Sequence, residues 1–494
     1  MRVNRSILRG WLGIGCALLL GTGAQADDFD GVRQQIRDAM VEQNIPSIAV
    51  AVARNSQILW EEGFGWADVA KRVPADAHTM YSLASISKPI TATALMILVE
   101  RGAIDLDKPM NDYLGAQKLT SPAFDVRQAT VRRVANHTSG LPLHYQFFYD
   151  DEKVTRPTMD ESIRRYGTLV REPGENWLYS NFGYGLLEYA IERASGKSYP
   201  QFMREELFAP LGLTETIAER PSASDGRAAE RYGVGVNRHQ VPFYDFDHRG
   251  ASAIYMSAHD LVRFGMFHLD GKLAGQKRQV LKQATLARML DQAVASDSEG
   301  KRTYGIGWGI GEMHGLQQFG HTGGMAGVRT QLSIYLESKT VVVILTNASG
   351  PDIRAIDNAI MHTVLPETIL KDRQSTLPAS LTGRWTGAVQ TYTGTTPVEL
   401  QVKEDGAVLA RVGKRPLRVV DEVALGKDGL LQLSNIEGDV GTPDAARYPY
   451  TLSFTLKQRG TDKLNGSVST LSRDLPDRAG NALSYWVALS KAEH

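Results

Sequence analysis

The chain has 494 residues, of which 42% are hydrophobic and 22% charged, and its 55 basic residues balance its 55 acidic ones. This length exceeds one typical domain, and this composition is that of an ordinary globular protein with a large core. The sequence has no basic run and no stripe of interleaved basic and aromatic residues, so we expect no nucleic-acid partner.

The first 26 residues have the three parts of a secretory signal peptide. Three arginines within residues 2–9 make a cationic start, residues 11–21 form an apolar core too short to span a bilayer, and residues 24–26 offer a small-residue cleavage site. We therefore expect a mature chain that begins at Asp27, located in the periplasm or secreted, with no membrane anchor.

Cys16, the only cysteine in the chain, lies inside this segment. A lipid attached to Cys16 is an alternative, but the apolar residues that follow it continue the hydrophobic core of the signal peptide. A mature chain without cysteine has no disulfide, no thiolate metal site and no cysteine nucleophile. It carries 52 basic and 55 acidic residues, a net charge of −3.

Residues 27–368 are expected to form a domain of mixed helices and strands. Apolar residues at helical spacing between Phe29 and Met40 predict a first amphipathic helix. Strands at residues 48–53 and 57–65 follow, and then a buried helix that stops near Gly102. Helical pieces broken by Pro and Gly are expected at residues 128–136, 161–170, 182–195 and 199–207.

Strands return after this helical stretch, and a last helix closes the domain. The expected strands cover residues 305–312, 317–321, 329–335 and 340–347, and the helix covers residues 351–364. Strands from both ends of the domain predict an α/β (α+β) fold with a central antiparallel sheet flanked by helices and an all-helical insertion. We expect a cleft for substrate between the sheet and the insertion.

The last part of the chain, residues 376–494, alternates apolar and polar residues with period two. Roughly eight short strands at this spacing predict an all-β, antiparallel barrel or sandwich. Gly383-Arg-Trp385 is similar to a lipocalin-like opening. Trp385 and Trp486 are expected in the core of this domain, and a small-molecule carrier built on the barrel is one functional alternative.

Ser85 and Lys88 are the first candidate catalytic pair. Three residues apart on one helical turn, their side chains point the same way. A serine hydroxyl needs a neighbouring base for activation, and a lysine desolvated by an apolar helix can supply it. Ser-x-x-Lys alone is weak evidence, since Ser298 and Lys301 repeat it in a polar turn. A plain helix-capping role for Ser85 is the structural alternative.

Two further stretches support this pair. Tyr179 and Asn181 form the only Tyr-x-Asn of the chain, on a loop that opens a predicted helix. Residues 319–324, with the sequence Phe-Gly-His-Thr-Gly-Gly, lie between two predicted strands. Together with Ser85 and Lys88 they offer a nucleophile, two possible bases, an amide and a polar strand edge.

With these motifs, the sequence resembles the serine β-lactamase and penicillin-binding-protein-like superfamily, in its class C-like branch. That branch also holds DD-carboxypeptidases, D-aminopeptidases and family VIII-type esterases. The resemblance covers roughly residues 30–365 and includes Asn136-His-Thr-Ser-Gly-Leu-Pro142, the small residues at 250–257 and Leu345-Thr-Asn347. It implies a β-lactamase-like fold for residues 27–368.

The resemblance also implies roles for individual residues. Ser85 is the nucleophile that becomes acylated, Lys88 its activating partner, and Tyr179 a general base and proton shuttle. Asn181 holds the substrate amide, and the backbone N–H groups of Ser85 and Gly324 form the oxyanion hole. We expect Tyr179 to be partly ionised near the Lys88 ammonium; the order in which the two take protons stays open.

The third motif departs from the class C pattern. It has His321, Thr322 and Gly323 where class C β-lactamases have Lys-Thr-Gly. Histidine gives a conditional charge where lysine gives a permanent one, which shifts the expected substrates toward peptides without excluding β-lactams. A His321 ring bonded to a backbone carbonyl is the structural alternative.

The expected function is hydrolysis of β-lactams or D-amino-acid peptides through an acyl-enzyme. The alternatives are a penicillin-recognising binder with little turnover and a family VIII-type carboxylesterase. We expect no cofactor and no metal ion, since the chain lacks His-Glu-x-x-His, and His259 and His268 fall on opposite faces of one helix. His137 is expected to be structural, and His248 to lie in a loop.

Overall fold

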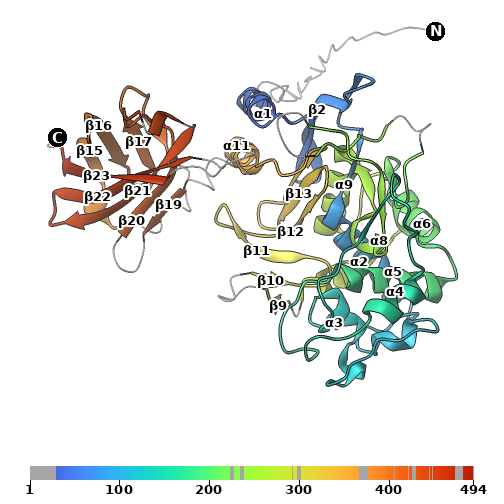
Figure 1. The fold of residues 1–494 in the computed structure, drawn as a ribbon. Coiled ribbons are helices and arrows are strands. Elements are labelled where there is room, and N and C mark those ends of the chain that lie inside the picture. The colour runs from blue at the N-terminus through green and yellow to red at the C-terminus, as the bar shows by residue number, and fades with distance from the viewer. Residues whose placement is uncertain are drawn as a thin grey trace, which may run out of the picture.

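A computed structural model describes most of the chain (Figure 1). The described residues are 29–222, 227–233, 238–291, 293–296, 302–365, 377–404, 406–420, 422–425, 430–443, 445–447, 449–472 and 482–492. The expected signal peptide and the second Ser-x-x-Lys match at Ser298 lie outside these residues. Within the described part of the chain, no helix combines the length and apolar character needed to cross a membrane.

The first domain is built on a nine-stranded antiparallel sheet. In spatial order its strands are β3 (Val73–Pro74), β2 (Gln57–Asp68), β1 (Ser47–Arg54), β14 (Thr340–Thr346), β13 (Val328–Tyr335), β12 (Leu316–Met325), β11 (Gly309–Met313), β10 (Thr303–Tyr304) and β9 (Val294–Ala295). β1 pairs with β14, so that Ile48 faces Thr346 across nearly 300 residues of sequence. The predicted sheet assembled from both ends of the domain is confirmed.

Helices cover both faces of this sheet (Figure 1). α1 (Asp30–Glu42) and α11 (Arg354–Val364) share one apolar cluster with Val50 and Ile344. On the other face, α9 (Ala258–Asp270) packs on β1 and β14, and α2 (Ser87–Glu100) belongs to the same apolar cluster as Ala49, Ala51 and Val343. Because side chains alternate along a strand, the alanines of β1 lie together on one face and admit a close helix.

A largely helical insertion lies, in the sequence, between the first strands of the sheet and the last ones. Its elements are η2 (Ala84–Ile86), η3 (Met110–Tyr113), η4 (Val126–Gln128), α3 (Val131–Ala135), α4 (Met159–Tyr166), α5 (Asn181–Ser195), α6 (Tyr199–Phe202), η5 (Met203–Phe208), α7 (Ala209–Leu211), α8 (Arg249–Ser252) and α10 (Gln283–Arg288). Small strands also occur there: β4 (Met80–Ser82) and β6 (Thr216–Ile217) flank β8 (Tyr255–Ser257), and β5 (Phe147–Tyr149) pairs with β7 (Tyr244–Phe246).

Two predicted boundaries are wrong. The strand expected at residues 305–312 begins only at Gly309, as β11, because Gly307 turns the chain with a φ of +86° between β10 and β11. The strand expected at residues 317–321 extends to Met325. The third motif therefore lies within β12 and not between two strands.

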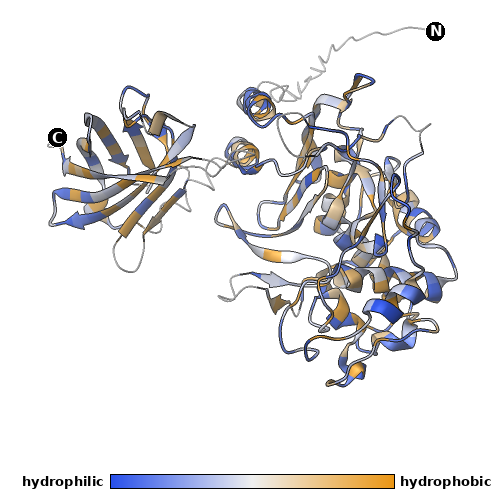
Figure 2. Cartoon of the chain, viewed as in Figure 1, coloured by the Kyte–Doolittle hydropathy of each residue, from blue (hydrophilic) through white to orange (hydrophobic). Residues whose placement is uncertain are grey.

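The C-terminal part is a second nine-stranded antiparallel sheet, curled into a half-barrel. Its strands, in spatial order, are β18 (Arg418–Val419), β17 (Val408–Val412), β16 (Gly394–Val402), β15 (Gly383–Thr391), β23 (Ala482–Lys491), β22 (Lys463–Ser472), β21 (Tyr450–Arg459), β20 (Leu430–Ile436) and β19 (Glu422–Leu425). Short 3₁₀ turns occur at η6 (Ala379–Leu381) and η7 (Ala445–Arg447). Figure 2 shows hydrophobic and hydrophilic residues alternating along these strands.

The prediction that two tryptophans lie in the core of this domain is right for one of them and wrong for the other. Trp385 is fully buried and donates a hydrogen bond from Nε1 to the carbonyl of Leu381 at 2.7 Å. Trp486 is 49% exposed. The period of two explains the difference, since the inward-facing positions of β23 are those of Val487 and Leu489.

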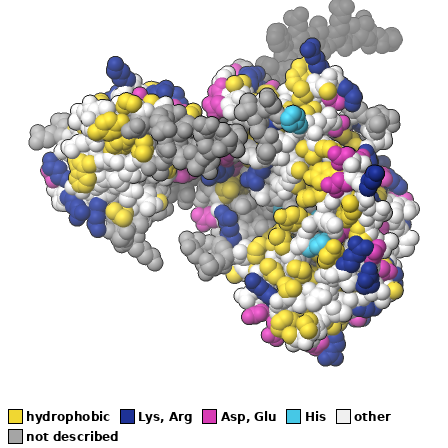
Figure 3. Space-filling view, viewed as in Figure 1, with side chains coloured by type: hydrophobic (Ala, Val, Ile, Leu, Met, Phe, Trp, Pro, Cys, Tyr) yellow, Lys and Arg dark blue, Asp and Glu magenta, His cyan; other side chains and the backbone are white. Residues whose placement is uncertain are grey.

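Acidic and basic side chains are interspersed over the face shown in Figure 3, beside smaller hydrophobic areas. No single-sign patch dominates this face. This distribution agrees with the balanced charge of the sequence.

Candidate active site

Ser85 lies in the 3₁₀ turn η2, directly before α2. The residue before it, Ala84, has a φ of +49°, a left-handed conformation that costs a non-glycine residue about 1–2 kcal/mol. Backbone contacts on Leu83 hold this turn: its N–H donates to the carbonyl of Ile254 at 2.9 Å, and its carbonyl accepts from Oγ1 of Thr330 at 2.9 Å. The turn leaves Ser85 only half-buried.

Lys88 is fully buried at the start of α2 and has three polar neighbours. Its Nζ atom lies 2.7 Å from Oδ1 of Asn181, 3.3 Å from the carbonyl of Ala251 and 3.1 Å from Oγ of Ser85. Burial lowers the pKa of Lys88 well below its usual value, which favours the neutral amine. A neutral amine has two N–H donors, which the two carbonyl oxygens accept, so its lone pair is left to accept the Ser85 hydroxyl proton.

Tyr179 lies beside this pair, with Nζ of Lys88 4.7 Å from the centre of its ring. Burial raises the pKa of Tyr179 above its usual value, although a hydrogen bond with Ser85 opposes the shift. The expectation of a partly ionised Tyr179 is therefore wrong in this geometry. The ammonium that was expected to stabilise the phenolate is itself disfavoured by burial, so the two pKa shifts favour a protonated Tyr179 and an uncharged Lys88.

Asn181 is the first residue of α5, and its Oδ1 atom accepts a hydrogen bond from Nζ of Lys88. The preceding residue, Ser180, caps the helix by accepting a hydrogen bond from the N–H of Gly183 at 3.1 Å. The cap fixes where α5 begins and so positions Asn181. Since Oδ1 orients the lysine, the side-chain NH₂ is the group through which Asn181 can hold a substrate carbonyl.

β12 contacts η2, the turn that carries Ser85 and that we call the nucleophile turn, at Gly323. A Cβ at this position would lie 2.2 Å from the carbonyl oxygen of Leu83 and 2.2 Å from Oγ1 of Thr330. Only glycine permits this approach, which brings the third motif against Ser85. Thr322 and Gly324 are exposed on the other side of the strand.

His321 uses both ring nitrogens within the protein. Nδ1 lies 2.7 Å from the carbonyl oxygen of the next residue, Thr322, and Nε2 lies 3.0 Å from Oη of Tyr304. A carbonyl only accepts, so Nδ1 carries the proton and Nε2 accepts from the tyrosine hydroxyl. Burial lowers the pKa of His321 to about 3. The structural alternative, a histidine bonded to a backbone carbonyl, is present, and His321 is neutral.

The structure thus brings Ser85, Lys88, Tyr179 and Asn181 together in one polar cluster, with His321 beside it: the rings of His321 and Tyr179 are 6.4 Å apart. A neutral lysine next to a serine hydroxyl can remove its proton, and a protonated tyrosine can pass one on. This is the arrangement needed for acyl transfer to serine.

A family model described as Beta-lactamase matches residues 32–365, more than half of the chain. The chain belongs to the beta-lactamase family. It is accordingly a serine hydrolase of this family.

Among curated proteins, the chain is similar to Penicillin-binding protein 4* of Bacillus subtilis (strain 168). It is 25% identical over 390 residues, which cover 73% of this chain and 83% of that protein. The structure of the octameric penicillin-binding protein homologue from Pyrococcus abyssi matches with a TM-score of 0.60 and 22% identity, over 93% of this chain and 99% of that one. The D-amino acid amidase from Ochrobactrum anthropi SV3 matches with a TM-score of 0.58 and 23% identity, over 70% and 99%. The Pyrococcus likeness covers the C-terminal half-barrel as well.

Within this beta-lactamase fold, sequence reasoning missed Tyr304. It is buried, donates to His321 and has its ring 4.7 Å from that of His137. No motif marks this tyrosine, which reaches the site only through the pairing of β10 with β11. His137, expected to be structural, is buried with its ring 4.5 Å from Tyr179, and its Nδ1 accepts from the N–H of Ser180 at 3.1 Å. His248, expected in a loop, is buried before α8 and lies 2.6 Å from Oδ1 of Asp247.

Proposed function

We propose that the chain is an exported serine hydrolase that forms an acyl-enzyme on Ser85 and hydrolyses D-amino-acid peptide or amide bonds and β-lactams. The observation that carries the proposal is the amine of Lys88. It is buried, and its Nζ atom lies within hydrogen-bond distance of two carbonyl oxygens and, at 3.1 Å, of Oγ of Ser85. A purely structural lysine would have no reason to be held neutral beside a serine hydroxyl.

In the first step, Oγ of Ser85 attacks the substrate carbonyl while its proton moves to Nζ of Lys88. The oxyanion is stabilised by the backbone N–H groups of Ser85 and Gly324; one such donor contributes about 2.7–4 kcal/mol. The C–N bond then breaks, and the departing amine takes a proton from the hydroxyl of Tyr179, which regains one from Lys88. Water, deprotonated by the same pair, cleaves the ester and frees Ser85.

The third motif favours substrates that the enzyme holds mainly through their amide group. His321 is neutral and has both ring nitrogens engaged, so it offers no permanent cation for a substrate carboxylate. Asn181 can hold the amide carbonyl through its NH₂ group. D-Amino amides and peptides fit this site better than a substrate that depends on a carboxylate contact. The likeness of the chain to the D-amino acid amidase from Ochrobactrum anthropi SV3 supports that class.

The test is a hydrolysis panel with a penicillin, a carbapenem, a D-Ala-D-Ala peptide, a D-amino amide and a nitrophenyl ester. We expect turnover of the D-amino amide or peptide, and a mass increase on Ser85 when the reaction is quenched. Ser85→Ala should abolish both. Hydrolysis and labelling that survive in Ser85→Ala would refute the proposal, whereas turnover of the ester alone would favour the carboxylesterase alternative.

A penicillin-recognising binder with little turnover is distinguished by kinetics. A fluorescent penicillin would label Ser85 persistently in a binder and only transiently in an enzyme. The protonated Tyr179 beside Ser85 favours turnover, because a leaving amine needs a proton donor.

Export rests on residues 1–26 alone. When the full chain is produced in a Gram-negative host, we expect the periplasmic fraction to contain a protein whose first residue is Asp27. A product that stays in the cytoplasm with its first 26 residues intact would contradict export and leave the proposed chemistry unaffected.

A further inference from the structure

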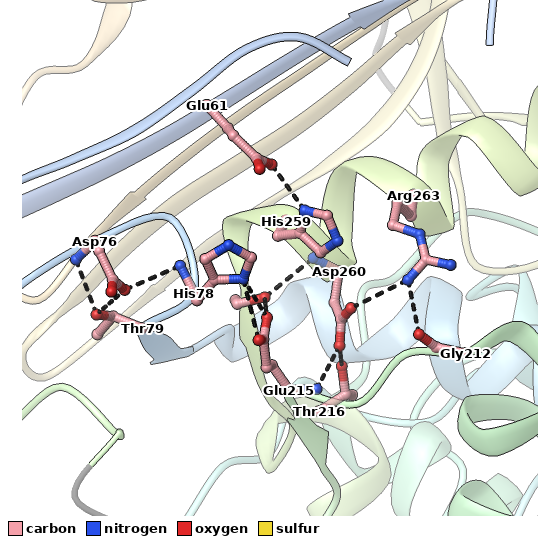
Figure 4. A network of polar contacts seen from close by, with 11 residues as sticks. Glu61, Asp76, His78, Thr79, Gly212, Glu215, Thr216, His259, Asp260 and Arg263 are labelled. Carbon is pink, nitrogen blue, oxygen red and sulfur yellow. Dashed lines mark hydrogen bonds and ion pairs between the residues drawn. The ribbon is translucent and has the colours of Figure 1, made fainter. Parts of the chain in front are cut away.

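Two histidines and two glutamates meet at a second place in the first domain, and the chemistry proposed above uses none of them. Glu61 is on β2, His78 lies two residues before β4, Glu215 directly precedes β6, and His259 is the second residue of α9. Figure 4 shows the four side chains converging from these separate elements, with the His78 ring between Glu215 and the pair formed by Glu61 and His259.

The contacts within this group divide the four residues into three ligands and one support. Nδ1 of His259 lies 2.9 Å from Oε2 of Glu61, and the rings of His78 and His259 are 4.8 Å apart. Potential ligand atoms of Glu61, His78 and His259 all lie within 4.8 Å of one another. Glu215 contacts His78 on the Nδ1 side of the ring: both oxygens of the Glu215 carboxylate are 2.9–3.0 Å from Nδ1.

We propose that Glu61, His78 and His259 bind a zinc ion, with water at the fourth position. Two imidazoles and one carboxylate are a ligand set that zinc accepts, whereas magnesium and calcium prefer oxygen ligands alone. The side chains of His78, His259 and Glu61 are 49%, 27% and 26% exposed, which leaves an entry path for the ion and room for water.

Glu215 supplies the feature that a chance cluster lacks. A carboxylate accepts a hydrogen bond from Nδ1 of His78, so this nitrogen carries the proton and Nε2 keeps its lone pair for a metal ion. Oγ of Ser257 donates to Oε2 of Glu215 at 3.0 Å and fixes the carboxylate in turn. Such a carboxylate–histidine–metal chain is the usual second layer of a zinc site.

The geometry requires a modest closure. Tetrahedral ligands at about 2.0–2.1 Å from zinc are roughly 3.4 Å apart, and the three ligand atoms are within 4.8 Å here. His78 is the most exposed of the three and can close the gap by rotation of its side chain.

Through its three ligands the ion would link β2, the segment that leads into β4, and α9. Through Glu215, which contacts His78, the link extends to β6. His78 is seven residues before Ser85, on the segment that runs through β4 into the nucleophile turn. We therefore assign the zinc a structural role: it holds the start of this segment against the sheet. Zinc should raise the thermal midpoint of the protein.

The experiment uses the full, untagged chain after treatment with EDTA, titrated with Zn²⁺ in a calorimeter and in parallel thermal melts. We expect one equivalent to bind and the midpoint to rise. His78→Ala and Glu61→Gln should each abolish this binding, and Glu215→Gln, which removes only the supporting carboxylate, should weaken it about 10–100-fold. His239→Ala, at an exposed histidine outside the group, is the matched control and should bind as the parent does.

The proposal is overturned if the parent chain binds no zinc, or if His78→Ala and Glu61→Gln bind it as well as His239→Ala does. The buried group of His144, Asp247 and His248 is unchanged in all of these variants. Binding there would survive the substitutions, so it would count against the site proposed here.

Discussion

Nζ of Lys88 lies 2.7 Å from Oδ1 of Asn181. This contact joins the first motif to the second and sets the direction of the amine. Because Asn181 and the carbonyl of Ala251 accept the two N–H groups, the lone pair is left for Ser85. An uncharged partner at this distance is essential, since a carboxylate in its place would favour the ammonium form.

Asn181→Asp should therefore raise the pKa of Lys88, because a carboxylate beside Nζ stabilises its charged form. The acid limb of the kcat/KM profile should move to higher pH, so that activity is lost at pH 7 and partly recovered as the pH rises. Asn181→Ala is the control: it removes the contact without adding charge, and its acid limb should not move up. An unchanged profile in Asn181→Asp would show that Lys88 is not the base.

Lys88→Arg should lower the rate of acylation by about 10²–10⁴, the usual contribution of a general base. A guanidinium cannot lose its proton at accessible pH, so no lone pair is available to Ser85. Stopped-flow acylation with the best substrate of the panel measures the effect, and thermal melts check the fold. The same change at exposed Lys272 should leave the rate as it is. Near-normal acylation by Lys88→Arg would assign the base to Tyr179.

Gly323→Ala should separate β12 from the nucleophile turn. The added methyl would lie 2.2 Å from the carbonyl oxygen of Leu83, and such overpacking costs about 1–3 kcal/mol. Gly324→Ala is the matched control for folding, since the nearest atom to its Cβ, Nη1 of Arg329, is 3.9 Å away. We expect a lower thermal midpoint and loss of acylation in Gly323→Ala, with a normal midpoint in Gly324→Ala. Equal midpoints in the two variants would contradict the close approach.

Glu188→Gln should stabilise the protein at alkaline pH. Glu188 is buried on α5, where it accepts a hydrogen bond from the N–H of Gly250 at 2.7 Å, and burial raises its pKa to about 8. Between the ordinary glutamate pKa and pH 8, the folded state holds a proton that the unfolded state has released. The free energy of unfolding therefore falls with pH in this window, by up to about 1.4 kcal/mol per unit.

Urea unfolding of the parent and of Glu188→Gln from pH 4.5 to 8.5 checks this expectation. The two curves should agree near pH 4.5 and diverge as the pH rises, with the variant the more stable. Exposed Glu175→Gln serves as the control and should follow the parent throughout. Parallel curves for Glu188→Gln would mean that Glu188 is ionised in the folded protein.

The sequence predicted the framework of this fold because its signals are local. Helical spacing marked α1, and period two marked the strands of the half-barrel. The same rule of alternation that predicted β23 also places Trp486 on its outer face, since Val487 and Leu489 face inward. The error at residues 305–312 came from Gly307, whose positive φ no apolar pattern reveals.

The candidate site was predictable in part for the same reason. Ser85 and Lys88 are separated by one helical turn, so their proximity follows from the sequence. Their distance to Asn181 does not. The lowered pKa of Lys88, the raised pKa of Tyr179 and the engaged nitrogens of His321 depend on burial and on partners distant in sequence.

The sequence by itself determined the order of the motifs, the two kinds of domain and the candidate nucleophile with its lysine, because each depends on residues close together in the chain. Only the tertiary structure decided which groups carry protons and which residues meet. Tyr304 on β10 reaches His321 on β12 because β11 pairs with both strands. Glu61 on β2 reaches His259 across almost 200 residues because α9 packs on the sheet. Desolvation and ligand geometry are properties of that packing, and no spacing along the chain encodes them.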